Sequence, residues 1–165
     1  KEIKAEQESN RVGGIMQKIY VGMATCGVSA GADAVYDRLR ELIEKEELPF
    51  ELEETGCIGL CAREPIMEIR DDKGGSDFYV EVDAKKAEAI VKAHLEGKKA
   101  DEFMMNEAEY KQYYGKQKKI VLRNSGLINP HSIDDYIARD GYKAIEKAVT
   151  SMTPDQVIQE MLDSG

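Results

Sequence analysis

The sequence predicts an α/β fold, in which helices flank a mixed β-sheet, followed by a mostly helical C-terminal segment. Three observations predict it. A β-rich run over residues 15–24 precedes a stretch, 32–46, in which apolar residues recur at helical spacing. Two short alternating runs, 66–69 and 78–82, flank a turn rich in Asp and Gly. Beyond Ser132, apolar residues again recur at the helical period.

The first part of the sheet is predicted from a strand, a helix and a second strand. The β-rich run 15–24 is the first strand, and residues 50–54 alternate as the second. The helix between them has an apolar face made of Ala32, Val35, Tyr36, Leu39, Leu42 and Ile43. A strand–helix–strand order favours two parallel strands that are neighbours in the sheet.

A hairpin completes the predicted sheet. Its strands are 66–69 and 78–82 and its turn is 71–75, so it adds antiparallel strands. A second amphipathic helix, closed by Gly97, is predicted from the spacing of Ala87, Ile90, Val91, His94 and Leu95. We expect His94 to be packed against the core.

Changes of composition divide the chain into four segments. Residues 1–14 are a polar lead-in, and residues 15–97 form the α/β domain. Residues 98–118 are charged and rich in Tyr without a clean period, so we expect a linker. Residues 119–165 are the fourth segment, which begins with a predicted short strand over 119–123.

The rest of the fourth segment is predicted to be helical. Ser132 precedes a short helix, which Asp140 and Gly141 end. Helical spacing returns with Tyr142, Ile145, Ala148, Val149 and Met152. A last helix begins at Thr153, because Thr can cap, Pro suits the first helical position and Gln156 can reach back to the cap.

The composition excludes several function classes. The 165 residues carry a formal net charge of −9, so the chain has no general electrostatic attraction to nucleic acid. No apolar run reaches the roughly 20 residues of a membrane-spanning helix, and no signal-peptide pattern is present, so we expect no membrane contact. Three cysteines do not indicate a disulfide framework and favour a reducing cytoplasm. The chain opens with Lys1 rather than Met, so we expect a processed or partial chain in which residue 1 is not the natural start.

The cysteines form the one constellation with clear chemical potential. Cys57 and Cys61 have C-x3-C spacing in a loop that contains glycine, and two such thiolates can chelate one iron. Cys26 also follows directly after a predicted strand. If the two strands are parallel neighbours, both cysteine loops emerge at the same end of the sheet, which predicts that the three thiols come together.

Other interpretations of the cysteines stay open at this point. Each of them could be a small buried hydrophobic residue. Cys57 and Cys61 could form a redox-active disulfide, although they lack the C-x-x-C spacing of such pairs. A structural zinc site would require a fourth ligand.

Two motifs resemble known proteins. Residues 22–32 (GMATCGVSAGA) and 54–61 (ETGCIGLC) resemble the two ligand loops of thioredoxin-like [2Fe-2S] ferredoxins. Such domains occur in a small subunit of respiratory complex I, and at the front of the NAD(P)H- and flavin-binding subunit of multimeric [FeFe] hydrogenases and related bifurcating enzymes. Residues 132–142 (SIDDYIARDGY), with Leu127 before them and 148–154 (AVTSMTP) after them, resemble the opening of that flavin-binding subunit.

The resemblance implies a thioredoxin-like fold over 15–97 and a truncated opening of a flavin- and NAD(P)H-binding domain over 119–165. No glycine-rich phosphate loop is present in the chain, so we expect FMN and NAD(P)H to bind only to the rest of a full-length parent. We therefore expect any dehydrogenase activity to belong to that parent.

The resemblance also implies a [2Fe-2S] cluster with Cys26, Cys57 and Cys61 as ligands. The family pattern is C-x4-C followed by C-x3-C, and these cysteines match its last three positions. The first position falls at Val21, which cannot bind iron. The fourth ligand stays open, and the candidates near Cys26 are the oxygens of Thr25 and Ser29 and the thioether of Met23, besides a group from the linker.

The implied function is one-electron transfer through the cluster, in a complex with other subunits of a multimeric oxidoreductase. The main alternative is a thioredoxin-like domain that has lost its cluster and serves as a docking module in the same kind of complex. The missing cysteine favours this alternative, and the three cysteines retained in turns favour the cluster. A thiol–disulfide oxidoreductase is a third interpretation.

Overall fold

A computed structural model describes residues 11–12 and 15–165 of the chain. The chain divides into two compact units, Lys1–Asn129 and Pro130–Gly165. The first unit holds the whole β-sheet and all three cysteines. Most of the predicted lead-in, residues 1–10 and 13–14, lies outside the described residues, whereas Arg11–Val12 form a strand, β1, that pairs with the next strand.

The sheet is mixed, as the sequence predicts. Strand β2 (Ile15–Gly22) lies at its centre and pairs in parallel with β3 (Phe50–Thr55) and antiparallel with β4 (Met67–Asp71). Strand β5 (Ser76–Tyr79) pairs antiparallel with β4 and completes the predicted hairpin. Strand β5 is shorter than predicted, because the chain leaves the ladder at Val80, whose N–H bonds to the carbonyl oxygen of Phe103.

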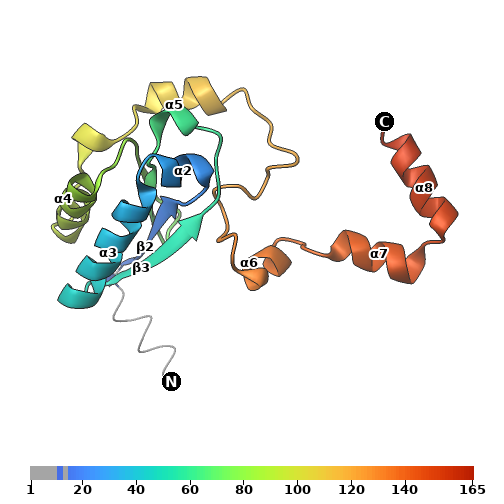
Figure 1. Cartoon of the computed structure of the whole chain (residues 1–165), viewed down its shortest axis with the longest axis horizontal. Helices are drawn as coiled ribbons and strands as arrows, with labels where there is room; N and C mark the ends of the chain where they lie inside the picture. The colour runs from blue at the N-terminus through green and yellow to red at the C-terminus, as the bar shows by residue number, and fades with distance from the viewer. Residues whose placement is uncertain (1–10, 13–14) are drawn as a thin grey trace. The chain divides into compact units, whose positions relative to one another are not determined.

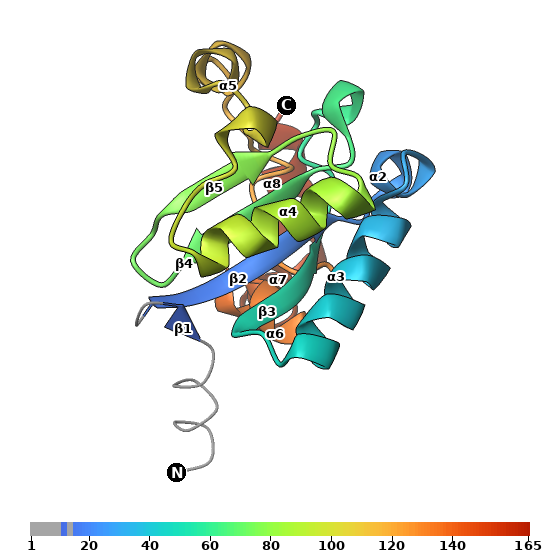
Figure 2. The same cartoon turned by 90° about the vertical axis from the view of Figure 1, so that its left-hand side faces the viewer.

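Two amphipathic helices cover one face of the sheet (Figure 2). Helix α3 (Ala32–Glu46) connects β2 to β3, and α4 (Ala84–Leu95) follows the hairpin. Asp83 caps α4 by accepting hydrogen bonds from the N–H groups of Lys85 and Lys86. The main core joins both helices to the sheet, and its fully buried members include Ile19, Val21, Val35, Leu39, Met67, Tyr79, Ile90 and Val91. This core confirms the amphipathic faces predicted for 32–46 and 87–95.

The segment after α4 contains more structure than the sequence indicates. It forms a 3₁₀ turn, η2 (Asp101–Phe103), and a helix, α5 (Glu107–Tyr114), whose N-terminus is capped by the side chain of Asn106. Met105 is buried in a second, smaller core with Leu60, Ile66 and Val80. The segment is therefore attached to the first unit by apolar packing.

The prediction of a strand over residues 119–123 is wrong. Residues 120–127 form bends and turns, and Ile120, Val121 and Leu122 are exposed. The β-rich composition of this stretch does not produce a strand because no neighbouring strand is paired with it in the described part of the chain. The loop is instead held to the sheet by Arg70, which donates to the carbonyl oxygen of Gly126, and by Asn129, which donates to Glu53 at 2.7 Å.

The second unit consists of short helices, as predicted. They are α6 (Ile133–Ala138), α7 (Lys143–Ser151) and α8 (Pro154–Asp163) (Figure 1). The capping box at Thr153 is confirmed, because its hydroxyl accepts from the N–H of Gln156 and its own N–H bonds to the Gln156 side chain at 2.8 Å. Within this unit, α7 and α8 are joined by an ion pair of 2.9 Å between Lys147 and Glu160.

No helix among the described residues is both long enough and apolar enough to span a bilayer.

Candidate metal centre

Both cysteine loops emerge at the same end of the sheet, as the sequence predicts. The last residues of β2 and β3, Gly22 and Thr55, are paired across the parallel ladder. Just beyond them, the N–H of Met23 bonds to the carbonyl oxygen of Thr55 at 3.0 Å. Helix α2 (Thr25–Ser29), which carries Cys26, and the 56–61 loop, which carries the other two cysteines, therefore start from adjacent positions (Figure 1).

Cys57 and Cys61 are brought together. Their Sγ atoms lie 3.9 Å apart, and both thiols are free. Two sulfurs bound to one tetrahedral metal at about 2.3 Å lie about 3.8 Å apart, so this spacing suits chelation of a single metal ion. The pair therefore fits one iron of a cluster without rearrangement of the loop.

Gly59 shapes this loop. Its φ of +91° lies in the left-handed region that favours glycine. The turn directs its N–H to the Sγ of Cys57 at 3.3 Å. Glycine thus lets a backbone N–H group approach the sulfur of Cys57.

The surroundings of Cys57 favour the neutral thiol when no cation is bound. Burial raises the pKa of Cys57, the hydrogen bond from Gly59 opposes that effect, and the nearby Cys61 and Glu64 add to it. A nucleophilic or redox-active thiol normally lies beside a cation or a helix N-terminus that lowers its pKa. The loop therefore resembles a metal site more than the site of a thiol–disulfide oxidoreductase.

Cys26 lies on α2 and is exposed. The helix approaches the end of β2 closely at Gly27, where an added Cβ would lie 2.0 Å from the carbonyl oxygen of Gly22. In the described part of the chain, no three His, Cys, Asp or Glu side chains gather around one point as they would for a single metal ion. A [2Fe-2S] cluster does not require that gathering, because each of its two irons takes two protein ligands. The structure therefore brings Cys57 and Cys61 together, whereas the predicted gathering of all three thiols is not seen among the described residues. Cys57 and Cys61 fit one iron of such a cluster, and Cys26 would have to bind the other iron.

Val21, where the family pattern has its first cysteine, is fully buried in the main core. Its side chain therefore belongs to the packing between sheet and helices. Met23 is also partly buried against this core, whereas Thr25 and Ser29 are exposed. None of these four residues is directed into the site by a contact in the described residues.

Sequence reasoning missed Glu64. It directly precedes Pro65, to which it is joined by a cis peptide bond, and its Oε2 accepts a hydrogen bond from the N–H of Ile66 at 2.9 Å. Glycine has no Cβ, and this oxygen occupies the space that results. A Cβ added at Gly22 would lie 3.2 Å from it, and one added at Gly27 would lie 3.3 Å from it. Burial raises the pKa of this carboxyl, and the bond from Ile66 partly offsets that. The only signal in the sequence is an acidic residue three positions after Cys61, which is too common to point to a site.

Helix α5 and the segment after it hold the cysteine loop from outside. The hydroxyl of Tyr113 donates to the carbonyl oxygen of Gly59 at 2.7 Å, and that of Tyr114 donates to the carbonyl oxygen of Ile58 at 3.3 Å. Lys119 reaches the same Ile58 carbonyl oxygen at 3.4 Å. Ile58 and Gly59, which lie between the two cysteines, are thus fixed by side chains more than fifty positions later in the chain.

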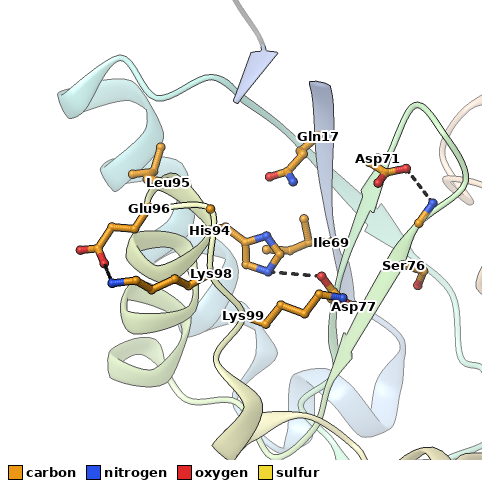
Figure 3. Close-up of a pocket in the computed structure, with 12 residues that line it drawn as sticks. Gln17, Ile69, Asp71, Ser76, Asp77, His94, Leu95, Glu96, Lys98 and Lys99 are labelled. Carbon is orange, nitrogen blue, oxygen red and sulfur yellow. Dashed lines mark hydrogen bonds and ion pairs between the residues drawn. The ribbon is translucent and has the colours of Figure 1, made fainter. Parts of the chain in front are cut away.

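A cavity of about 480 Å³ lies where β2 begins and β4 ends, at the end of the sheet opposite Gly22 and Thr55. Figure 3 shows the residues that line it. His94, buried as predicted, lines it and bonds through Nε2 to the hydroxyl of Tyr79 at 2.7 Å. Asp77 lies 3.8 Å from the same nitrogen and pairs with Lys99. Burial lowers the pKa of His94 and raises the pKa of Tyr79 to about 12. The network satisfies the buried polar groups of Tyr79, His94 and Asp77.

Comparison with solved structures finds thioredoxin-like [2Fe-2S] ferredoxins from Aquifex aeolicus. The wild-type protein is 18% identical, with a TM-score of 0.48, and the match covers 55% of this chain and 97% of that one. A cysteine-to-serine variant of that ferredoxin is 17% identical, with a TM-score of 0.49, and the match covers 56% of this chain and all of that one.

Among curated proteins, the NADP-reducing hydrogenase subunit HndC of Solidesulfovibrio fructosivorans is 50% identical over 50 residues. The match covers 30% of this chain and 10% of HndC, so this chain spans about a tenth of the length of that relative.

The family model of thioredoxin-like [2Fe-2S] ferredoxins matches residues 10–95. The match contains Cys26, Cys57 and Cys61 and the sheet and helices that carry them. Because residues 10–95 are more than half of the 165-residue chain, the protein belongs to the thioredoxin-like [2Fe-2S] ferredoxin family.

Proposed function

We propose that this chain transfers single electrons through a [2Fe-2S] cluster bound by Cys26, Cys57 and Cys61. The observation that carries the proposal is the pair Cys57 and Cys61, whose sulfurs lie 3.9 Å apart in a loop that also directs the N–H of Gly59 to Cys57. Membership of the ferredoxin family supports the same cofactor. When bound, the cluster supplies a centre that gains and loses one electron without bond formation to a substrate.

The residues around the site would bind the cluster, orient its sulfur ligands and adjust its reduction potential. Cys57 and Cys61 provide two thiolates on one side, and the N–H of Gly59 stabilises negative charge on the first of them. Tyr113 and Tyr114 restrain the carbonyl groups of Gly59 and Ile58, and they would limit movement of the two cysteine sulfurs when a cluster is bound. A restrained loop would keep small the reorganisation that accompanies electron transfer.

We further propose that the chain works as the N-terminal part of an NAD(P)H-linked flavin and iron–sulfur oxidoreductase subunit. The local identity with the hydrogenase subunit HndC supports this proposal. The exposed apolar residues of α7 and α8 also support it, because Ile145, Val149, Ile158, Met161 and Leu162 need a covering surface. FMN and NAD(P)H would then bind to other parts of the parent, the partners would be other subunits of the complex, and the free thiols suit a reducing cytoplasm.

A docking module without a cluster is the second candidate. Two observations favour it: the chain has only three cysteines, and the place of the fourth is the buried Val21. The two candidates differ in one measurable property, which is whether the anaerobically purified protein contains iron and sulfide.

Redox spectroscopy on the purified full chain tests the proposal. We expect visible absorption that bleaches on addition of dithionite, a rhombic EPR signal in the reduced state, and recovery of the absorption on reoxidation. NADH or NADPH alone should not bleach the protein, because no phosphate-binding glycine loop is present in its sequence. A colourless protein that takes up no iron on reconstitution would instead support the docking module.

A further inference from the structure

We propose that the carboxylate of Glu64 is the fourth ligand and completes the coordination of the iron that Cys26 binds. This inference deepens the proposed function and rests on it. It assigns a protein oxygen to the position that the family pattern gives to a cysteine and that Val21 cannot fill.

The first argument is the position of the carboxylate. Glu64 follows Cys61 by three residues, yet its Oε2 lies next to the segment that carries Cys26. A Cβ added at Gly22 would lie 3.2 Å from this oxygen, and one added at Gly27 would lie 3.3 Å from it. Gly27 is the residue directly after Cys26. The carboxylate therefore bridges from the loop of Cys61 to the loop of Cys26, and the two glycines leave the space that it occupies.

The second argument is charge. Glu64 is half-buried, and within the described part of the chain its carboxylate forms no ion pair and accepts one hydrogen bond, from Ile66. Glu68 lines the same small pocket, but its charge is balanced by a cation. It pairs with Arg70 at 2.5 Å and accepts a hydrogen bond from the hydroxyl of Ser76. A carboxylate withdrawn from water either takes up a proton or is stabilised by a nearby cation or metal. Glu64 would receive that positive charge from an iron bound at this site.

The third argument compares the donors. A carboxylate is an established ligand of iron in proteins and carries the same single negative charge as the thiolate that it replaces. The hydroxyls of Thr25 and Ser29 are neutral and exposed, and Met23 is partly buried against the core. Glu64 is the only one of these candidates that already lies between the two loops.

The experiment uses ⁵⁷Fe-enriched full chain, purified anaerobically, with two readouts. Mössbauer spectroscopy of the oxidised protein reports the ligands of each iron. Release of iron to a chelator reports how firmly the cluster is held. The variants are Glu64→Gln, the matched control Glu68→Gln and the double variant Gly22→Cys/Glu64→Ala, which places a thiol where the carboxylate lies.

We expect two unequal iron environments in the unaltered protein. Glu64→Gln should shorten the lifetime of the bound iron by at least about tenfold, since loss of even an outer partner of a metal ligand costs about 10–100-fold in affinity. Glu68→Gln should leave both readouts unchanged. The double variant should restore the lifetime and make the two iron environments alike.

Two results would overturn the inference, and they differ. If the unaltered protein holds a cluster and Glu64→Gln changes neither readout, Glu64 is not a ligand and the proposed function stands. If the unaltered protein holds no cluster under any condition, the proposed function fails and the inference fails with it. Far-UV circular dichroism of each variant separates loss of the ligand from loss of the fold.

Discussion

The hydroxyl of Tyr113 donates a hydrogen bond of 2.7 Å to the carbonyl oxygen of Gly59, which lies 54 positions earlier in the chain and between the two cysteines of the C-x3-C motif. Helix α5 lies outside the region that the family model matches, and this contact fixes it to the cysteine loop inside that region. The loop is restrained from both sides, by its attachment to β3 and by this contact.

Replacing Tyr113 by Phe should loosen the loop. Loss of one hydrogen bond lowers the free energy of unfolding by about 0.5–1.5 kcal/mol, and the freed loop should release iron to a chelator faster. Tyr110→Phe is the matched control, because Tyr110 lies on the same helix and packs edge-on against Phe78 at a centroid distance of 5.7 Å, with no hydrogen bond from its hydroxyl in the described residues. Equal iron release from the two variants would show that the contact with Gly59 does not stabilise the site.

Replacing Gly59 by Ala should strain the loop. A residue with a Cβ at a φ of +91° costs about 1–2 kcal/mol, and relief of that strain would turn the Gly59 N–H away from Cys57. We expect lower thermal stability and, in the loaded protein, a shifted reduction potential. Gly56→Ala is the control, since Gly56 lies in the same loop without a positive φ and a Cβ there would touch nothing within 4 Å. The strain argument fails if both variants melt at the same temperature.

His94 should make the stability of the first unit depend on pH. Burial lowers the pKa of His94, Asp77 opposes this effect and Lys99 adds to it, so the unfolded chain binds a proton at higher pH than the folded chain does. The contribution is complete above the unfolded pKa of about 6.5 and is lost as the pH falls from there toward the folded pKa. Denaturant unfolding between about pH 5 and 7 should therefore show decreasing stability toward acid.

The chain has two histidines, which gives a direct control for this prediction. His94→Gln should flatten the dependence of the unfolding free energy on pH, whereas His131→Gln should preserve it. Since Glu64 has a raised pKa, it contributes with the opposite sign, losing stability as the pH rises from about 4.5. If His94→Gln and the unaltered protein show the same slope, the pH dependence comes from other groups.

Acidic residues near the loops should lower the reduction potential, because reduction adds negative charge. Glu54 lies three positions before Cys57, within about 11 Å along an extended chain. Neutralising it by Glu54→Gln should raise the potential by about 20 mV, the effect of one charge at about 10 Å in water. Glu44→Gln is the control, as Glu44 lies about 18 Å along α3 from its start next to α2. A redox titration in which both variants shift equally would contradict a local electrostatic effect.

The architecture around the cysteines could be predicted because short-range patterns determine it. Alternation in β2 and β3, with the apolar face of α3 between them, is enough to infer a parallel pair, and a parallel pair puts the chain after Gly22 beside the chain after Thr55. The capping box at Thr153 was likewise predictable, because all its groups lie within four residues.

The remaining features depend on long-range contacts. Helix α5 has a weakly amphipathic sequence and is held by tyrosines that bond to residues 58 and 59, which no periodicity reveals. Residues 119–123 have strand-like composition, yet no strand in the described part of the chain pairs with them, and residues 120–123 form a bend and turns. Glu64 gains its position only because Gly22 and Gly27, far away in the sequence, leave room for its carboxylate.

The iron and acid-labile sulfide content of the anaerobically purified full chain tests the central claim most directly. The account predicts about two irons and two sulfides per chain, the content of one [2Fe-2S] cluster, and loss of both when Cys57 and Cys61 are replaced by Ser. A protein that contains neither iron nor sulfide, even after anaerobic reconstitution with its three cysteines reduced, would contradict electron transfer by this chain and support the docking module.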